Sequence, residues 1–287
     1  MALTERNNVS IAQIIFFIPF LFTAIFLCIR HGFGRDAGWL VLVIFSLARL
    51  IGASAQLATI SDPTNITLYT ISLVLQSIGL SIFLTVLFAL LSRTLSSIHK
   101  ARSTVLNPFH LRVIHLAIVA SIVLGIIGGS NSAQSASNGG VYTPSNLSQA
   151  AVIVTIVVYV ILVAITVLLW GNISYAEPGE NRTLIAVSAS LPILLIRIIY
   201  SAVSILAQTP SFNQLTGSDG IFVGLEVIPE LVIVLIIEAV GLTLPIRSKN
   251  DSAPSGLRRQ GTYSRVSAPP VPDHEMHHMN QRDTAYV

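Results

Sequence analysis

Four charged side chains stand out because each lies inside a long apolar stretch of the sequence: Arg49, Arg197, Glu226 and Glu230. An ionisable side chain at the centre of a bilayer costs roughly 2.5–3.5 kcal/mol on insertion scales, so such residues usually pair or serve a function. Glu226 and Glu230 are four positions apart and therefore share one face of a helix. Two arginines and two glutamates at similar depth can neutralise one another. We therefore expect a buried polar centre, with Glu238 further along the same stretch.

Uncharged polar residues at helical spacings extend this polar centre. Gln56 follows Arg49 by seven positions, Tyr200 follows Arg197 by three, and Gln76 lies in the intervening apolar stretch. Two interpretations fit the pattern. Either the charges only hold helices together as ion pairs, or the same residues form a site for a small molecule, a lipid or an ion.

Seven apolar stretches must position these residues. Crossing a bilayer takes about 20 apolar residues, and lipid offers no hydrogen-bond partner to a free backbone, so each such stretch must be helical. The predicted spans are residues 11–29, 37–60, 67–91, 111–129, 148–170, 184–207 and 221–245. The sequence thus predicts an all-α membrane protein built as a seven-transmembrane helix bundle.

The composition excludes several other classes of protein. Of the 287 residues, 53% are hydrophobic and only 10% are charged, whereas soluble domains carry roughly 25% charged residues. This balance excludes a soluble enzyme and a disordered chain, and the single Cys28 excludes an intrachain disulfide. The net charge of +3 comes from too few basic residues for a nucleic-acid surface.

The basic residues predict the orientation in the membrane. The loops after spans one, three and five and the C-terminal tail hold two, four, one and six Lys or Arg residues. On the opposite side only Arg6 is basic. Because cytosolic loops are enriched in Lys and Arg, residues 1–10 are predicted to be a short extracellular N-terminus and the C-terminus cytosolic. The plasma membrane is the expected location, with an endomembrane as the alternative.

The tail, residues 247–287, is polar and rich in proline, which predicts a disordered cytosolic segment. Thr262 and Ser264 follow a pair of arginines, a pattern that suits phosphorylation by a basophilic kinase or a basic strip on anionic lipid. On the predicted outer side, Asn8 and Asn65 begin N-glycosylation sequons.

Two helix-shaping patterns accompany the charges. Pro192 and Pro229 lie inside spans six and seven, where a proline removes a backbone hydrogen bond and predicts a kink. In span four, small residues recur every four positions from Ala117 to Gly129. Such a stripe permits close helix packing, either within the bundle or in a homodimer.

Catalytic and metal chemistry find little support. Residues 274–278 (HEMHH) match a zinc-protease pattern, but they lie in the tail rather than on a stable helix. Neither lysine lies in a span, which excludes a retinal Schiff base. We expect no enzyme activity, no metal and no cofactor.

Three segments carry a resemblance to a known family: residues 45–56 (FSLARLIGASAQ), 228–234 (IPELVIV) and 239–245 (AVGLTLP). Together with the seven spans, they resemble the family called domain of unknown function 7702, over about residues 10–246. The resemblance implies a fungal integral membrane protein with no established activity. The topology is also similar to fungal RTA-like lipid-translocating exporters and Pth11-like receptors.

Three functions are compatible with these features. A receptor-like sensor would use the basic loop at residues 92–110 and the tail to meet a cytosolic signalling partner. A transporter or lipid translocator would use the midplane charges and the prolines. A structural or assembly protein would need only the ion pairs and the small-residue stripe.

Overall fold

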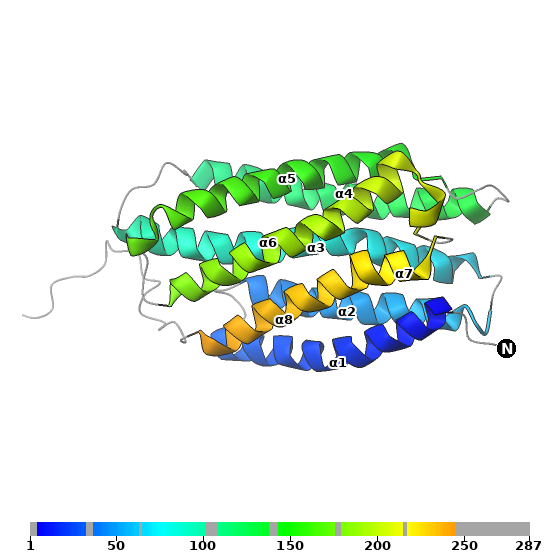
Figure 1. Ribbon diagram of the computed structural model, residues 1–287, viewed down its shortest axis with the longest axis horizontal. Helices are drawn as coiled ribbons and strands as arrows, with labels where there is room; N and C mark the ends of the chain where they lie inside the picture. Colours follow the sequence, from blue (N-terminus) through cyan, green and yellow to red (C-terminus); the bar gives the residue numbers. More distant parts are fainter. Residues whose placement is uncertain are drawn as a thin grey trace, which may run out of the picture. The chain divides into compact units, whose positions relative to one another are not determined.

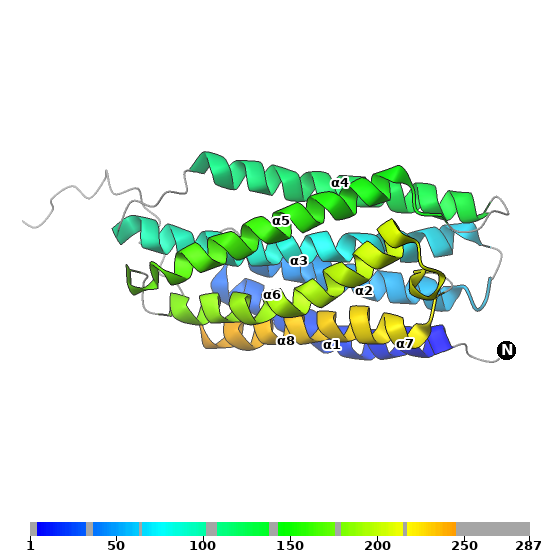
Figure 2. The ribbon, with the colours of Figure 1, turned by 45° about the horizontal axis from the view of Figure 1, so that its top comes forward.

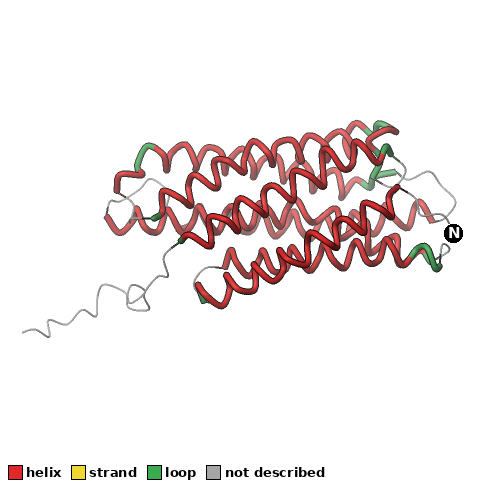
Figure 3. The backbone as a smooth tube through the Cα atoms, turned by 60° about the horizontal axis from the view of Figure 1, so that its bottom comes forward, coloured by secondary structure: helices red, strands yellow, loops and turns green. Residues whose placement is uncertain are grey.

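A computed structural model describes residues 5–32, 37–62, 65–101, 108–137, 143–175, 179–214 and 217–244. Regular structure in these segments is helical throughout and includes no strand (Figure 3). The predictions for residues 247–287, with Thr262 and Ser264, lie outside the described residues.

Eight α-helices follow one another in the part of the chain that the structure describes. They are α1 (Glu5–His31), α2 (Ala37–Ala58), α3 (Ile66–Ala101), α4 (Pro108–Ser137), α5 (Asn146–Trp170), α6 (Glu180–Ala202), α7 (Asp219–Phe222) and α8 (Ile228–Thr243). A π-helical turn, η2 (Val203–Ala207), extends α6, and a second, η4 (Val223–Val227), joins α7 to α8. Seven continuous helical stretches result in the described segments, each long and apolar enough to cross a membrane. The predicted all-α bundle of seven spans is confirmed, and the protein is an integral, multi-pass membrane protein.

Several helices extend beyond the apolar stretches that predicted them. α3 has 36 residues, a length of about 54 Å at 1.5 Å per residue, which exceeds a hydrocarbon core of roughly 30 Å. α1 begins six residues before the predicted span, and α4 continues through the Ser- and Asn-rich segment to Ser137. The reason is that hydropathy marks the lipid-buried part of a helix, whereas backbone hydrogen bonding continues into water.

α3 lies at the centre of the bundle, with the other helices packed lengthwise around it (Figures 1 and 2). It contacts α2, α4, α5 and α6, while α8 packs between α1 and α6. Aromatic rings join the first three helices, since the Phe45 ring lies 5.7 Å from that of Phe17 and 4.2 Å from that of Phe83. The central helix therefore fixes the positions of its neighbours relative to one another.

The outer helices expose apolar side chains as a membrane environment requires. Ile15 on α1, Leu116 on α4 and Val167 on α5 are each more than 60% exposed. Water would penalise such surfaces, whereas lipid does not, so these faces contact the bilayer.

The small-residue stripe of α4 packs inside the bundle. The Ser121 hydroxyl forms hydrogen bonds with the hydroxyls of Ser81 on α3 (2.8 Å) and Thr155 on α5 (2.7 Å). A Cβ on Gly125 would lie 3.6 Å from Ile78 of α3. This stripe therefore serves intramolecular packing.

Candidate functional site

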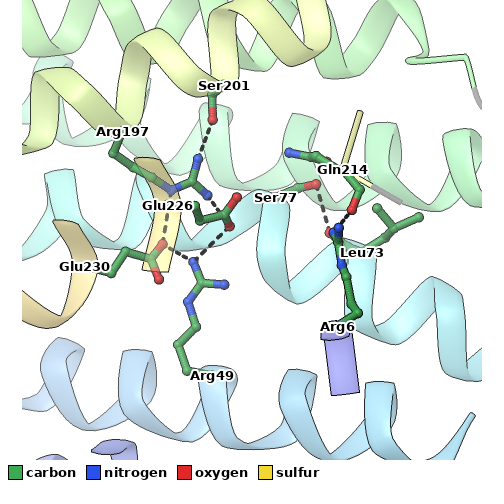
Figure 4. Close-up of polar contacts among 9 residues, drawn as sticks. All are labelled: Arg6, Arg49, Leu73, Ser77, Arg197, Ser201, Gln214, Glu226 and Glu230. Carbon is green, nitrogen blue, oxygen red and sulfur yellow. Dashed lines mark hydrogen bonds and ion pairs between the residues drawn. The ribbon is translucent and has the colours of Figure 1, made fainter. Parts of the chain in front are cut away.

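The four membrane-buried charges predicted as a polar centre meet in the interior of the bundle (Figure 4). Arg197 of α6 donates from Nη2 to Glu226 Oε1 at 2.7 Å and from Nε to Glu230 Oε1 at 3.2 Å. Arg49 of α2 donates from Nη2 to Glu230 Oε1, and the same nitrogen lies 3.7 Å from Glu226 Oε1. Because each arginine faces both carboxylates, we treat these residues as one unit, the four-charge cluster.

Because the four-charge cluster is buried, losing one of its members would strongly destabilise the fold. Arg197, Glu226 and Glu230 are 0% exposed and Arg49 is 5% exposed. Arg197 also donates from Nη1 to the Ser201 hydroxyl at 2.6 Å. Removing one partner of a buried pair leaves an uncompensated charge, which typically costs 3–5 kcal/mol. The cluster therefore locks α2 and α6 to span seven.

The cluster retains unused hydrogen-bonding capacity. Both carboxylates receive their hydrogen bonds on Oε1. Within the described residues, Oε2 of Glu226, Oε2 of Glu230 and Nε of Arg49 have no hydrogen-bond partner. Buried polar atoms are usually satisfied, so unpartnered ones call for an explanation.

Local backbone features make room for the charges. A Cβ on Gly79 of α3 would overlap the Arg49 guanidinium, so only glycine permits this close approach. Pro229 follows the π-helical turn η4, which carries Glu226. Proline donates no backbone hydrogen bond, and π-helical turns occur frequently at functional sites. The predicted kink at Pro229 thus coincides with a change of helix type, whereas Pro192 lies within an uninterrupted α6.

A small polar cavity reaches Arg49 from the end of the bundle where α1 begins. Its walls include Arg6, Gln13, Arg49, Gln56 and Gln76, together with Phe222 of α7. Gln56 Oε1 accepts a hydrogen bond from the Ser72 hydroxyl at 3.3 Å. The centre of a water-sized molecule can occupy a volume of about 20 Å³ inside the cavity. This space is enough for one water or an ion of similar size. The structure thus brings the predicted residues Gln56 and Gln76 to the edge of the cluster.

Tyr200 contacts the four-charge cluster but not the cavity. Its ring is 1% exposed, lies 5.6 Å from the Arg197 guanidinium carbon and packs 6.1 Å from the ring of Phe212. It does not belong to the walls of the cavity. Tyr200 therefore supports Arg197 from the side rather than facing the cavity.

Arg6 closes the same end of the cavity, an arrangement the sequence did not predict. Its Nη1 lies 3.2 Å from Asp219 Oδ1, its Nη2 donates to the Gln214 carbonyl, and its guanidinium lies 4.3 Å from the centre of the Phe222 ring. These contacts tie α1 to the segment that begins span seven. The available signal was that Arg6 is the one basic residue on the predicted outer side.

Comparison with protein families matches residues 3–247 to the family described as Domain of unknown function (DUF7702). The chain belongs to this family. The match covers the four-charge cluster, the cavity and Arg6, and it confirms the family expected from the three sequence segments. Comparisons with curated proteins and with solved structures gave no match.

A second buried ion pair lies at the end of the helix bundle opposite to Arg6. Arg93 of α3 donates from Nε to Glu180 Oε1 of α6 at 3.0 Å, and the Thr94 hydroxyl donates to Glu180 Oε2 at 3.2 Å. The hydropathy pattern predicts that Arg93 lies in the loop after span three. That placement is wrong because α3 continues to Ala101, which brings Arg93 against the start of α6.

Three further residues singled out in the sequence, Glu238, Asn8 and Asn65, lie outside the four-charge cluster. Glu238 of α8 is 3% exposed, and its Oε1 has no hydrogen-bond partner among the described residues. Asn8 is exposed on α1, whereas the Asn65 side chain donates to Asp62 and accepts from the Thr67 amide, both at 3.1 Å. Glycosylation of the two asparagines remains a prediction. No group of three or more His, Cys, Asp or Glu residues suited to a metal occurs in the described segments.

Proposed function

We propose that the protein is a receptor-like membrane sensor whose polar centre responds to a small ligand arriving from the N-terminal end of the bundle. The observation that carries the proposal is that Arg49 belongs both to the cavity wall and to the four-charge cluster. A ligand that contacts Arg49 would compete with Glu226 and Glu230 for its hydrogen bonds. The proposal assigns no enzymatic reaction to the site.

Span seven provides a route from the cavity to the other end of the bundle. It carries Glu226 and Glu230 near its middle, and its last carbonyls accept hydrogen bonds from two basic side chains. Arg30 donates to the Leu242 carbonyl at 2.6 Å, and Arg182 donates to the Thr243 carbonyl at 3.2 Å. A displacement of span seven would therefore change contacts at the end we propose to be cytosolic, where a signalling partner would bind.

The distribution of basic residues supports the direction of sensing. Arg6 lies at the end of the cavity that the Lys and Arg asymmetry predicts to face the outside of the cell. A ligand would then come from the external medium. We therefore propose the plasma membrane as the location, because only there would the cavity face the external medium.

The proposal makes a specific prediction about which side of the membrane reaches the cavity. We would replace the buried Cys28 by alanine and introduce Gln56→Cys in the cavity wall. Because residue 56 is only half-buried, a charged, membrane-impermeant thiol reagent should label this cysteine from the N-terminal side only. Ile51→Cys on the same helix is the matched control, because residue 51 is 54% exposed on the apolar surface and should resist the reagent.

The other outcomes separate the competing functions. Labelling from both sides, alternating with conditions, would favour a transporter or lipid translocator over a sensor. Resistance from both sides, together with normal stability, would favour a purely structural role. In cells, deletion of the gene should abolish a response to an external solute, whereas sensitivity to lipophilic drugs with intact responses would contradict the sensor.

A further inference from the structure

We infer that the cavity lined by Arg6, Arg49, Gln56 and Gln76 is a binding site for a small monovalent anion of about the size of chloride. This inference rests on the proposed function, since it names the chemical class of the ligand that the sensor would detect.

The charges around the cavity favour an anion. Its two charged wall residues, Arg6 and Arg49, are both cationic, and no aspartate or glutamate belongs to the wall. The remaining polar wall residues are glutamines and serines, which add no negative charge. The wall itself therefore presents guanidinium N–H donors and no carboxylate, which favours an anion over a cation.

Two buried side chains of the cavity wall each have one nitrogen donor without a hydrogen-bond partner among the described residues. Arg49 is 5% exposed and Gln76 is 8% exposed, and neither Arg49 Nε nor Gln76 Nε2 has a hydrogen-bond partner among the described residues. In Figure 4 one terminal nitrogen of Arg49 points away from the two carboxylates and toward the Arg6 end of the bundle. Donors buried in this way require an acceptor, and an anion accepts several hydrogen bonds at once.

The volume of the cavity limits the size of the anion. About 20 Å³ is open to the centre of a water-sized molecule, which suits one monoatomic ion or one water. A lipid headgroup or an amino acid would need the walls to move apart. Chloride is therefore the appropriate probe.

Charge balance connects anion binding to the four-charge cluster. The formal charges of two arginines and two glutamates cancel, and Asp219 offsets Arg6. An added anion would compete with the Glu230 carboxylate for the Arg49 guanidinium, because both are negatively charged acceptors. Binding is therefore expected to weaken the Arg49–Glu230 pair and to shift span seven.

The test measures the thermal stability of the purified full-length protein, in lipid nanodiscs, against chloride concentration. Gluconate at equal ionic strength controls for charge screening. Chloride should raise the unfolding temperature in a saturable way, and Gln76→Leu should weaken the apparent affinity about tenfold or more, since it removes a hydrogen bond to a charged ligand. Gln149→Leu on α5, outside the cavity wall, should leave the affinity unchanged.

A second variant keeps the test informative if Gln76→Leu fails to fold. Ala53→Val narrows the cavity without touching a charged residue, and it should also reduce the chloride effect. Equal stability in chloride and gluconate would overturn the inference, as would equal chloride affinities of the Gln76→Leu and Gln149→Leu variants. A crystal soaked with bromide that shows a water and no bromide in the cavity would also overturn it. Because these measurements use purified protein, a negative result here differs from a failure of sensing in cells.

Discussion

Arg49 and Glu230 are separated by 181 positions in the sequence, yet their side chains form a buried ion pair that joins α2 to α8. Glu230 also accepts a hydrogen bond from Arg197 Nε at 3.2 Å. One carboxylate oxygen thus connects three spans. The stability of the bundle and the state of the cavity consequently depend on the same few atoms.

The pairing predicts strong coupling in a double-mutant cycle. Arg49→Met and Glu230→Gln should each reduce the free energy of unfolding by about 3–5 kcal/mol, since each leaves a buried charge without its partner. The double variant should lose less than the sum, with a coupling of about 1–3 kcal/mol. Denaturant unfolding in detergent measures all four proteins.

Arg49→Met combined with Glu238→Gln is the matched control, because Glu238 lies eight positions further along the helix. That pair of substitutions should be additive. Coupling as large as that of Arg49 with Glu230 would argue against a direct ion pair.

The close approach of α3 to Arg49 predicts a steric effect of one methyl group. Gly79→Ala should destabilise the protein by about 1–3 kcal/mol because its Cβ would overlap the guanidinium. Gly224→Ala, where a Cβ would meet nothing within 4 Å, should be neutral or stabilising by up to about 1 kcal/mol. Thermal unfolding of both variants tests the difference, and similar losses for the two glycines would contradict it.

The contacts of Arg6 predict control over access to the cavity. Arg6→Ala removes its interactions with Asp219, the Gln214 carbonyl and the Phe222 ring. A cysteine at position 56 should then react several-fold faster with an impermeant reagent from the N-terminal side. Glu5→Ala, an exposed neighbour, should leave the labelling rate unchanged, and a rate unaffected by Arg6→Ala would show that Arg6 does not close the cavity.

The pair at the opposite end predicts a graded loss of stability. Glu180→Gln should reduce the free energy of unfolding by about 3 kcal/mol, because Arg93 is 8% exposed and its ion pair with the Glu180 carboxylate would be lost. Thr94→Val removes only one hydrogen bond to the carboxylate and should cost about 1–3 kcal/mol. If Arg93→Met combined with Glu180→Gln costs the full sum of the single losses, the pair contributes no coupling.

The sequence predicts the spans and the four-charge cluster because lipid imposes strict rules. A charge in an apolar stretch must find a partner, and the four-residue spacing of Glu226 and Glu230 sets the face they share. The contacts of Arg93 and Arg6 depend instead on how far helices continue beyond the apolar stretch and how they rotate about their axes, which hydropathy does not encode. Neither π-helical turn has a pattern of its own in the sequence, although η4 directly precedes the helix that carries Pro229.

The buried carboxyl group of Glu238 lowers the stability of the bundle. Its carboxyl group is buried, and its Oε1 has no hydrogen-bond partner among the described residues. A buried polar group without a partner is a net cost that an apolar side chain of similar volume would remove. Substitution of Glu238 by leucine or methionine is therefore expected to raise the stability of the protein. A loss of activity in such a variant would indicate that the carboxylate is needed for function.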